Sequence, residues 1–214
     1  MRYIKKILLT LLTLFVAGGF ASAREPIVAA FKTAPTEVFP LIDKSVRLDM
    51  IDYFDSPNNV GGENALMGRS RIMEIVPGSM KISMTSASRY QIVILPKETG
   101  DTLVAVISTM LVPAPDSKIA IFGSDWTPIA ADKLFKRPLL KEWLTAAGKK
   151  AADQVEILVP FILVGYDFDP VSLTLTLTNN TSTFLSEEVY EIVKPYFLEK
   201  LVYRWNGKIF KLIK

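Results

Sequence analysis

The chain has 214 residues, of which half are apolar and 22% are charged, and it contains neither histidine nor cysteine. So many apolar side chains exclude an intrinsically disordered chain. The missing residue types exclude disulfides, cysteine nucleophiles, Ser-His-Asp triads and His/Cys zinc or copper sites. The formal net charge is +3, but three basic residues and no acidic ones lie in positions 1–23. The remaining chain has 22 basic and 22 acidic side chains, and this balance argues against a nucleic-acid partner.

Residues 1–23 have the three parts of a secretory signal peptide. Basic residues come first, an almost unbroken apolar run follows from Ile7 to Ala17, and the segment ends in Ala21-Ser22-Ala23, the pattern that signal peptidase reads. A membrane anchor is the alternative, but a bilayer span needs roughly 20 apolar residues and this run is shorter. We expect cleavage after Ala23, a periplasmic or secreted protein, and no membrane span in the mature chain.

Residues 24–214 are expected to form a single domain, because they contain no fixed repeat, no low-complexity tract and no long linker. An extended lead-in is expected over residues 24–35. Pro40 suits the first turn of a helix that is predicted to run to Phe54, since apolar residues recur there with helical spacing. Asp43 and Arg47 are four residues apart, and we expect both on the solvent side of this helix.

The middle of the chain predicts antiparallel strands separated by turns, over residues 71–76, 80–85, 88–95, 102–109 and 118–122. The fourth of these is apolar on both faces, which predicts a central strand. A short helix is expected after Pro138. Residues 155–164 are expected to form a strand that is bulged or at an edge, because Pro160 cannot donate a ladder hydrogen bond.

The last third predicts a strand over residues 171–178, where leucines alternate with polar residues, and a short helix capped by Ser186. Asn206-Gly207 is typical of a two-residue type I′ hairpin turn. That turn would place Trp205 opposite Lys208 and Tyr203 opposite Phe210, with these side chains on the core face. The fold class is therefore α+β, with one large antiparallel sheet and three or four short helices. A curled, propeller-like or barrel-like closure of the strands is the alternative architecture.

Two carboxylates form the candidate ligand-binding pair. Asp167 and Asp169 alternate with aromatic residues in the segment 165–170 and would share one face if that segment is extended. Such a pair could bind sugar hydroxyls or calcium, or do acid–base chemistry. The simpler interpretation is a polar turn between two strands. The sequence identifies no catalytic residue, no metal site and no cofactor.

Other polar clusters have two interpretations each. Asp49, Asp52 and Asp55 crowd the unfavourable end of the first predicted helix, which indicates either a cation or basic partner, or compensation by a neighbouring basic side chain. The segment 179–182 contains glycosylation acceptor patterns and is interpreted as a loop. A late basic cluster could contact anionic envelope surfaces or be an ordinary solvated hairpin face; it comprises Lys194, Lys200, Arg204, Lys208, Lys211 and Lys214.

Several phrases resemble one family of exported Bacteroidetes proteins. The most specific is Arg47-Leu48-Asp49-Met50-Ile51-Asp52-Tyr53, and three weaker ones are residues 64–71, the stretch from Asp116 to Pro128, and residues 203–207. The chain is similar in these phrases to the family catalogued as domain of unknown function 3256 (DUF3256). The resemblance implies a Gram-negative envelope or secreted location and carries no activity and no catalytic residues.

The leading functional hypothesis is a non-catalytic periplasmic or secreted binding or structural module. The alternative is a carboxylate-dependent hydrolase or carbohydrate-active enzyme of the cell envelope that uses Asp167 and Asp169. A third hypothesis is an envelope component that docks through a sheet edge or the terminal hairpin. The partner would be an envelope protein or a glycan.

Overall fold

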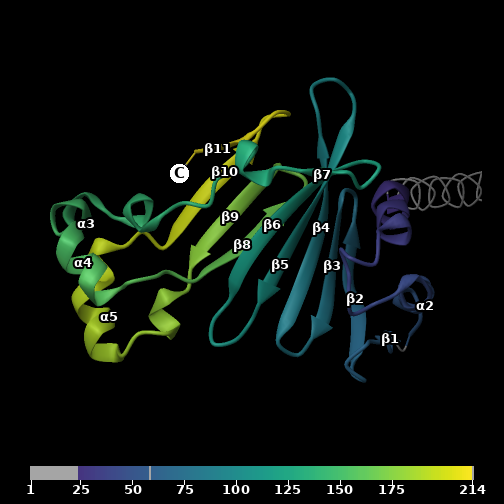
Figure 1. Cartoon of the computed structure of the whole chain (residues 1–214), viewed down its shortest axis with the longest axis horizontal. Helices are drawn as coiled ribbons and strands as arrows, with labels where there is room; N and C mark the ends of the chain where they lie inside the picture. Colours follow the sequence, from purple (N-terminus) through teal and green to yellow (C-terminus); the bar gives the residue numbers. More distant parts are fainter. Residues whose placement is uncertain (1–23, 58, 214) are drawn as a thin grey trace, which may run out of the picture.

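The computed structural model describes residues 24–57 and 59–213, and the expected signal peptide lies outside them. Two open antiparallel sheets and several short helices make up the fold (Figure 1). The larger sheet has seven strands in chain order: β1 (Gly62–Glu63), β2 (Arg69–Val76), β3 (Ser79–Thr85), β4 (Ser88–Pro96), β5 (Thr102–Met110), β6 (Asp116–Gly123) and β7 (Pro128–Ile129). The smaller has the order β11-β10-β9-β8, from β8 (Val164–Asp169), β9 (Thr174–Asn179), β10 (Lys200–Trp205) and β11 (Phe210–Leu212). The expected α+β class is confirmed, and neither sheet closes into a barrel.

Helices cover one face of the seven-stranded sheet. Residues 24–33 are helical, so the expected extended lead-in is wrong. Ile27 and Phe31 explain the difference: they are four residues apart, share one helical face, and are fully buried against the sheet. The second helix, α2 (Lys44–Phe54), begins four residues later than expected because the carboxylate of Asp43 caps it, accepting from Val46 N at 2.9 Å.

Arg47 of α2 is buried, contrary to the expectation that it lies on the solvent side. Its guanidinium donates to the carbonyl of Ile42 at 3.1 Å and to that of Ala34 at 2.5 Å. The segment between the two helices folds back over the side chain of Arg47. The sequence pattern of that segment did not predict this contact. Burial lowers the pKa of Arg47.

The central strand of the large sheet is confirmed as β5, which is buried on both faces. Val104 and Val106 pack toward the helices. Leu103, Ala105 and Ile107 pack toward the four-stranded sheet. Between the two sheets, the ring of Phe135 lies edge-on to three aromatic rings at centroid distances of 5.3–5.8 Å, those of Tyr166, Tyr203 and Phe210.

A group of short helices lies at one end of the molecule (Figure 1). It contains η2 (Leu140–Trp143), α3 (Ala146–Lys150), α4 (Ala152–Leu158), α5 (Glu187–Val193) and η4 (Lys194–Tyr196). The prediction of a strand over residues 155–164 is therefore wrong, because a strand begins only at Val164, with β8. Val155 and Val159 are buried one helical turn apart, whereas Ile157 is 82% exposed. A short apolar run does not by itself distinguish a helix from a strand. The Ser186 cap of α5 is confirmed. The strand expected over residues 171–178 is confirmed from Thr174 onward as β9, whereas residues 171–173 form a turn.

The terminal hairpin forms, but its register differs by two residues from the expected one. Trp205 lies opposite Phe210, and Tyr203 lies opposite Leu212. Asn206 explains this, because its side chain accepts from the backbone N–H groups of residues 208 and 209 and closes a longer loop than a type I′ turn. A slip of two residues keeps every side chain on its face, so Trp205 and Phe210 remain in the core. No described helix is long and apolar enough to cross a bilayer.

Candidate functional site

Asp167 and Asp169 lie on the exposed outer face of β8, side by side as the extended interpretation required. The alternative of a polar turn is wrong for this pair, because the strand continues through Asp169 and the turn follows it. Lys81 Nζ lies 3.0 Å from the Asp167 carboxylate and 3.7 Å from that of Glu74. Asp169 accepts from Ser172 Oγ at 2.5 Å and from Val171 N at 2.9 Å. These two hydrogen bonds lower the pKa of Asp169.

The four-stranded sheet covers only part of the second face of the large sheet. Its core contacts are with β4, β5 and β6. The side chains that β2 and β3 direct away from the helices stay uncovered, and so does Arg89 at the start of β4. Along β3 these side chains are Lys81, Ser83 and Thr85, which alternate with residues buried under the helices. Ser79, at the start of the same row, is buried and accepts from Gln91 Nε2 at 2.9 Å.

Three adjoining hollows follow this uncovered row, and together we call them the β3 trough. The first, of about 330 Å³, is lined by Asp167, Asp169 and Lys81. The second, of about 320 Å³, is lined again by Lys81 and Asp167, and also by Arg89 and Ser83. The third, of about 500 Å³, is lined by Ser83 and Arg71 with Thr85. Since shared residues join each hollow to the next, the trough runs the length of β3.

Strand β8 forms one wall of the trough, and side chains of the large sheet hold it in place. Gln91 accepts from Phe168 N at 3.0 Å and donates to Phe168 O at 2.7 Å. Ser117 Oγ accepts from Tyr166 N at 2.9 Å. The outward N–H groups of Tyr166 and Phe168 and the carbonyl of Phe168 are thereby bonded to the large sheet, which hinders pairing of this edge with another strand.

An arginine anchors the same wall from the far side. Arg137 donates to the Asp116 carboxylate at 2.6 Å and to Ser117 O at 2.8 Å. Asp116 also accepts from Val164 N at 2.9 Å, at the start of β8. The neighbouring Tyr166 is 4% exposed, and burial raises its pKa to about 12.

The charges of the trough are divided between its two ends. At one end, Glu74 and Asp167 are both paired with Lys81. At the other end, Arg71 and Arg89 lie on either side of Ser83 in the strand register. Neither arginine takes part in an ion pair with any residue that the structure describes.

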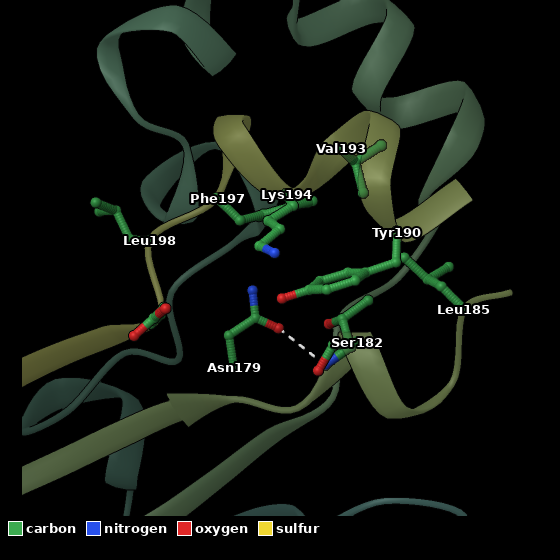
Figure 2. A pocket seen from close by; sticks show the side chains of 10 residues that line it. Asn179, Ser182, Leu185, Tyr190, Val193, Lys194, Phe197 and Leu198 are labelled. Carbon is green, nitrogen blue, oxygen red and sulfur yellow. Dashed lines mark hydrogen bonds between the residues drawn. The ribbon is translucent and has the colours of Figure 1, made fainter. Parts of the chain in front are cut away.

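A second, smaller cavity of about 70 Å³ lies among the helices at the end of β9 (Figure 2). The amide of Asn179, the hydroxyl of Tyr190 and the ammonium of Lys194 point toward one another there. Asn179 Oδ1 accepts from Thr181 N at 3.0 Å, which turns its amide nitrogen into the cavity. Glu199 also lines it. The size suits a few water molecules rather than a ligand.

The remaining sequence clusters have mainly structural explanations. Arg24 lies 3.7 Å from Asp55, which supports compensation within the acidic cluster. Within residues 24–57 and 59–213, no three acidic side chains are grouped so as to hold a metal ion. In the late basic cluster, Lys208 pairs with Glu98 at 2.6 Å, and Lys194 with Glu191 at 3.5 Å. Lys214 lies outside the described residues.

Sequence reasoning identified the two aspartates but missed the cationic half of the trough. The available signal was the polar alternation along the strands, with Arg71, Lys81, Ser83 and Arg89 each following an apolar or opposite-face position. That pattern marks a face that is not part of the core. It does not indicate which polar faces meet, because the strand register decides that.

Comparisons with known proteins identify a fold and a family without an activity. The family model described as "Protein of unknown function (DUF3256)" matches residues 21–210. No curated protein matches the chain. A solved structure, that of a domain of an uncharacterized protein from Porphyromonas gingivalis W83, is similar with a TM-score of 0.72 and 19% identity. The similarity covers 88% of this chain and 98% of that one. At this identity, it shows the fold alone.

Proposed function

The chain belongs to DUF3256, a family of proteins of unknown function, and we propose that it is a non-catalytic module that binds an extended glycan in the β3 trough. The observation that carries the proposal is the continuous trough, whose three hollows are joined by shared polar residues. Strand β3 runs through six residue steps from Ser79 to Thr85. At about 3.3 Å per residue, the trough is about 20 Å long.

The chemistry of the floor supports a hydroxyl-rich chain. Ser83 and Thr85 offer hydroxyl groups, and Lys81 and Arg89 offer charged donors. The main chain of β3 is already paired on both sides, with β2 and with β4. A peptide could not add a strand there, so it would lose the backbone hydrogen bonds on which β-augmentation depends.

The carboxylates support binding more than hydrolysis. A glycosidase needs one carboxylic acid with a raised pKa as its general acid. The pKa of Asp169 is lowered instead, by Ser172 Oγ and Val171 N, and Asp167 is paired with Lys81 at 3.0 Å. In these positions the two aspartates suit the acceptance of hydrogen bonds from sugar hydroxyls.

We further propose that the protein works outside the cytoplasm, in the periplasm or after secretion. The signal-like organisation of residues 1–23 supports this location. An envelope or secreted location would place the trough where bacterial polysaccharides are found.

The test is a glycan array probed with residues 24–214 and with a variant whose trough is blocked. Ser83→Trp would fill the junction between two of the three hollows. The matched control is Arg204→Trp, which introduces the same bulky side chain at an exposed position of β10. We expect one class of polysaccharide to bind the wild type and Arg204→Trp, and not Ser83→Trp. Equal binding by all three proteins would place the site elsewhere, and no binding to any glycan would refute the proposal.

A further inference from the structure

The most informative feature that the proposed function leaves unexplained is the pair of arginines at one end of the trough. Arg71 lies opposite Ser83, and Ser83 lies opposite Arg89, so all three side chains share one face. Neighbouring strands are about 4.8 Å apart, which places the two arginine Cα atoms about 10 Å apart. Arginine side chains are long enough to meet above the serine from both sides.

The acidic side chains of the trough do not neutralise these arginines. Lys81 stands between them and the aspartate end, and it holds both Glu74 and Asp167. Asp169 is bonded to Ser172 and to a backbone N–H group of the next turn. No ion pair in the described part of the chain includes Arg71 or Arg89.

A third arginine adds to the positive charge at this end. Arg69 lines the same hollow as Arg71 and is held to the backbone by bonds from Nε to Val60 O at 2.7 Å and from Nη2 to Gly61 O at 3.1 Å. The result is a fixed positive charge with two free guanidinium groups beside it. Like charges at such a spacing repel one another, and an oxyanion between them would replace that repulsion with charge-assisted, bidentate hydrogen bonds.

We propose that Arg71 and Arg89 bind an acidic group of the ligand above Ser83, so that the glycan held in the β3 trough is an acidic one. This inference rests on the proposed function. The group is an oxyanion carried by a sugar, either a carboxylate or a phosphate, and both would be recognised by the same two guanidinium groups. The lysine and the carboxylates at the other end then contact the hydroxyls of the neighbouring sugars.

The experiment is a calorimetric titration of residues 24–214 with four probes. These are an oligogalacturonate, a phosphorylated mannan oligosaccharide, a neutral oligosaccharide of equal length, and a polyglutamate peptide. Each is titrated into the wild type, Arg71→Gln, Arg89→Gln and the double variant. Arg204→Gln, an exposed arginine of β10, is the matched control for loss of one positive charge. Circular dichroism confirms that each variant is folded.

We expect at least one acidic oligosaccharide to bind the wild type more tightly than the neutral one and to lose affinity as salt rises. Each arginine substitution should weaken that binding about tenfold, as expected for loss of a charge-assisted hydrogen bond, and Arg204→Gln should not. The relative affinities of the carboxylate and phosphate probes identify the group.

Three results would overturn this inference, and each is distinguishable from failure of the proposed function. If neutral and acidic oligosaccharides bind equally, and Ser83→Trp abolishes both, the trough binds glycans but the arginines do not select acids. If polyglutamate binds in an arginine-dependent way and no oligosaccharide does, the ligand is an acidic peptide. If the acidic probes bind the double variant as tightly as the wild type, the acidic group lies elsewhere.

Discussion

Gln91 of β4 and Phe168 of β8 exchange two hydrogen bonds, with the amide of the glutamine taking the place of a neighbouring strand. Phe168 N donates to Oε1 at 3.0 Å, and Nε2 donates to Phe168 O at 2.7 Å. The glutamine lies on one sheet and the phenylalanine on the other, 77 residues apart in the sequence. This contact therefore joins the two sheets and fixes the wall of the β3 trough.

Replacing this glutamine should destabilise the protein strongly. Gln91→Leu keeps a similar volume but leaves the buried N–H and C=O groups of Phe168 without partners. Each such group costs about 1–3 kcal/mol, so we expect the free energy of unfolding to fall by about 2–4 kcal/mol. Urea unfolding followed by circular dichroism measures it. Gln154→Leu, at an exposed position of α4, should change it by less than about 0.5 kcal/mol. Equal stability of the two variants would show that Gln91 does not hold β8.

The stability of the protein should fall in alkaline solution, partly because of Tyr166. Burial raises the pKa of this phenol to about 12, above the ordinary value of 10.0 for an exposed tyrosine. Between these two values the unfolded state loses the proton more readily than the folded state. The stabilisation is therefore complete below about pH 10 and is lost as the pH rises toward 12.

The variant Tyr166→Phe isolates this contribution. The difference between the pKa of Tyr166 in the unfolded and folded states corresponds to about 2–3 kcal/mol, and that share of the alkaline loss should disappear in the variant. Unfolding free energies at a series of pH values from 8 to 12 measure the difference. Burial also raises the pKa values of Tyr90 and Tyr203, so a smaller loss should remain. Parallel pH profiles for the variant and the wild type would contradict the assignment.

Arg47 should contribute to stability, although its sequence pattern predicts a position on the solvent side of the helix. Arg47→Ala removes the donors to Ala34 O and Ile42 O and leaves a space beside Phe39, over whose ring the guanidinium lies at 5.9 Å. We expect a loss of about 2–4 kcal/mol in thermal or urea unfolding. Arg24→Ala breaks a solvent-accessible ion pair at 3.7 Å and a cation–π contact with Phe54 at 5.9 Å, and should cost less than about 1 kcal/mol. If the two losses are equal, the buried hydrogen bonds of Arg47 contribute nothing measurable.

Expression of the full chain in a Gram-negative host should yield a protein that begins at Arg24. The pattern Ala21-Ser22-Ala23 predicts this cleavage. Helical residues begin directly after it, and Ile27 of that helix is fully buried, so we expect the cleaved protein to retain this helix. Intact mass measurement of the periplasmic fraction and of the medium tests both the site and the location. An uncleaved chain in the membrane fraction would favour an anchor instead.

The phrases that resemble the family explain more about the fold than about the site. Arg47 joins two helical segments, and Asn64 is buried, where its side chain bonds to Ser70 Oγ and Met84 O. Asp116 holds the start of β8, and the buried Trp126 donates to Thr33 Oγ1 at 3.3 Å. These roles are structural. They fit a family whose members share a scaffold, although Arg69 and Arg71 of the trough also lie within one of these phrases.

The sequence by itself determined the five long strands β2 to β6 of the large sheet, the two-faced burial of β5 and the helix that Ser186 caps. Each of these depends on local periodicity or on a capping side chain, which a few adjacent residues specify. The two-residue strands β1 and β7 were not predicted. The helix over residues 24–33 and the helix α4 were not predicted, because short apolar runs acquire their structure from what they pack against. The hairpin register was decided by the side chain of Asn206.

Only the tertiary structure decided where the candidate site lies. Asp167 and Asp169 were found from their alternation, but their surroundings come from β3 and β4, more than 70 residues earlier in the chain. The grouping of Arg71, Ser83 and Arg89 depends on the register of three strands. Register and sheet packing are long-range properties, so the sequence shows which side chains face away from the core, and only the fold shows which of them face one another.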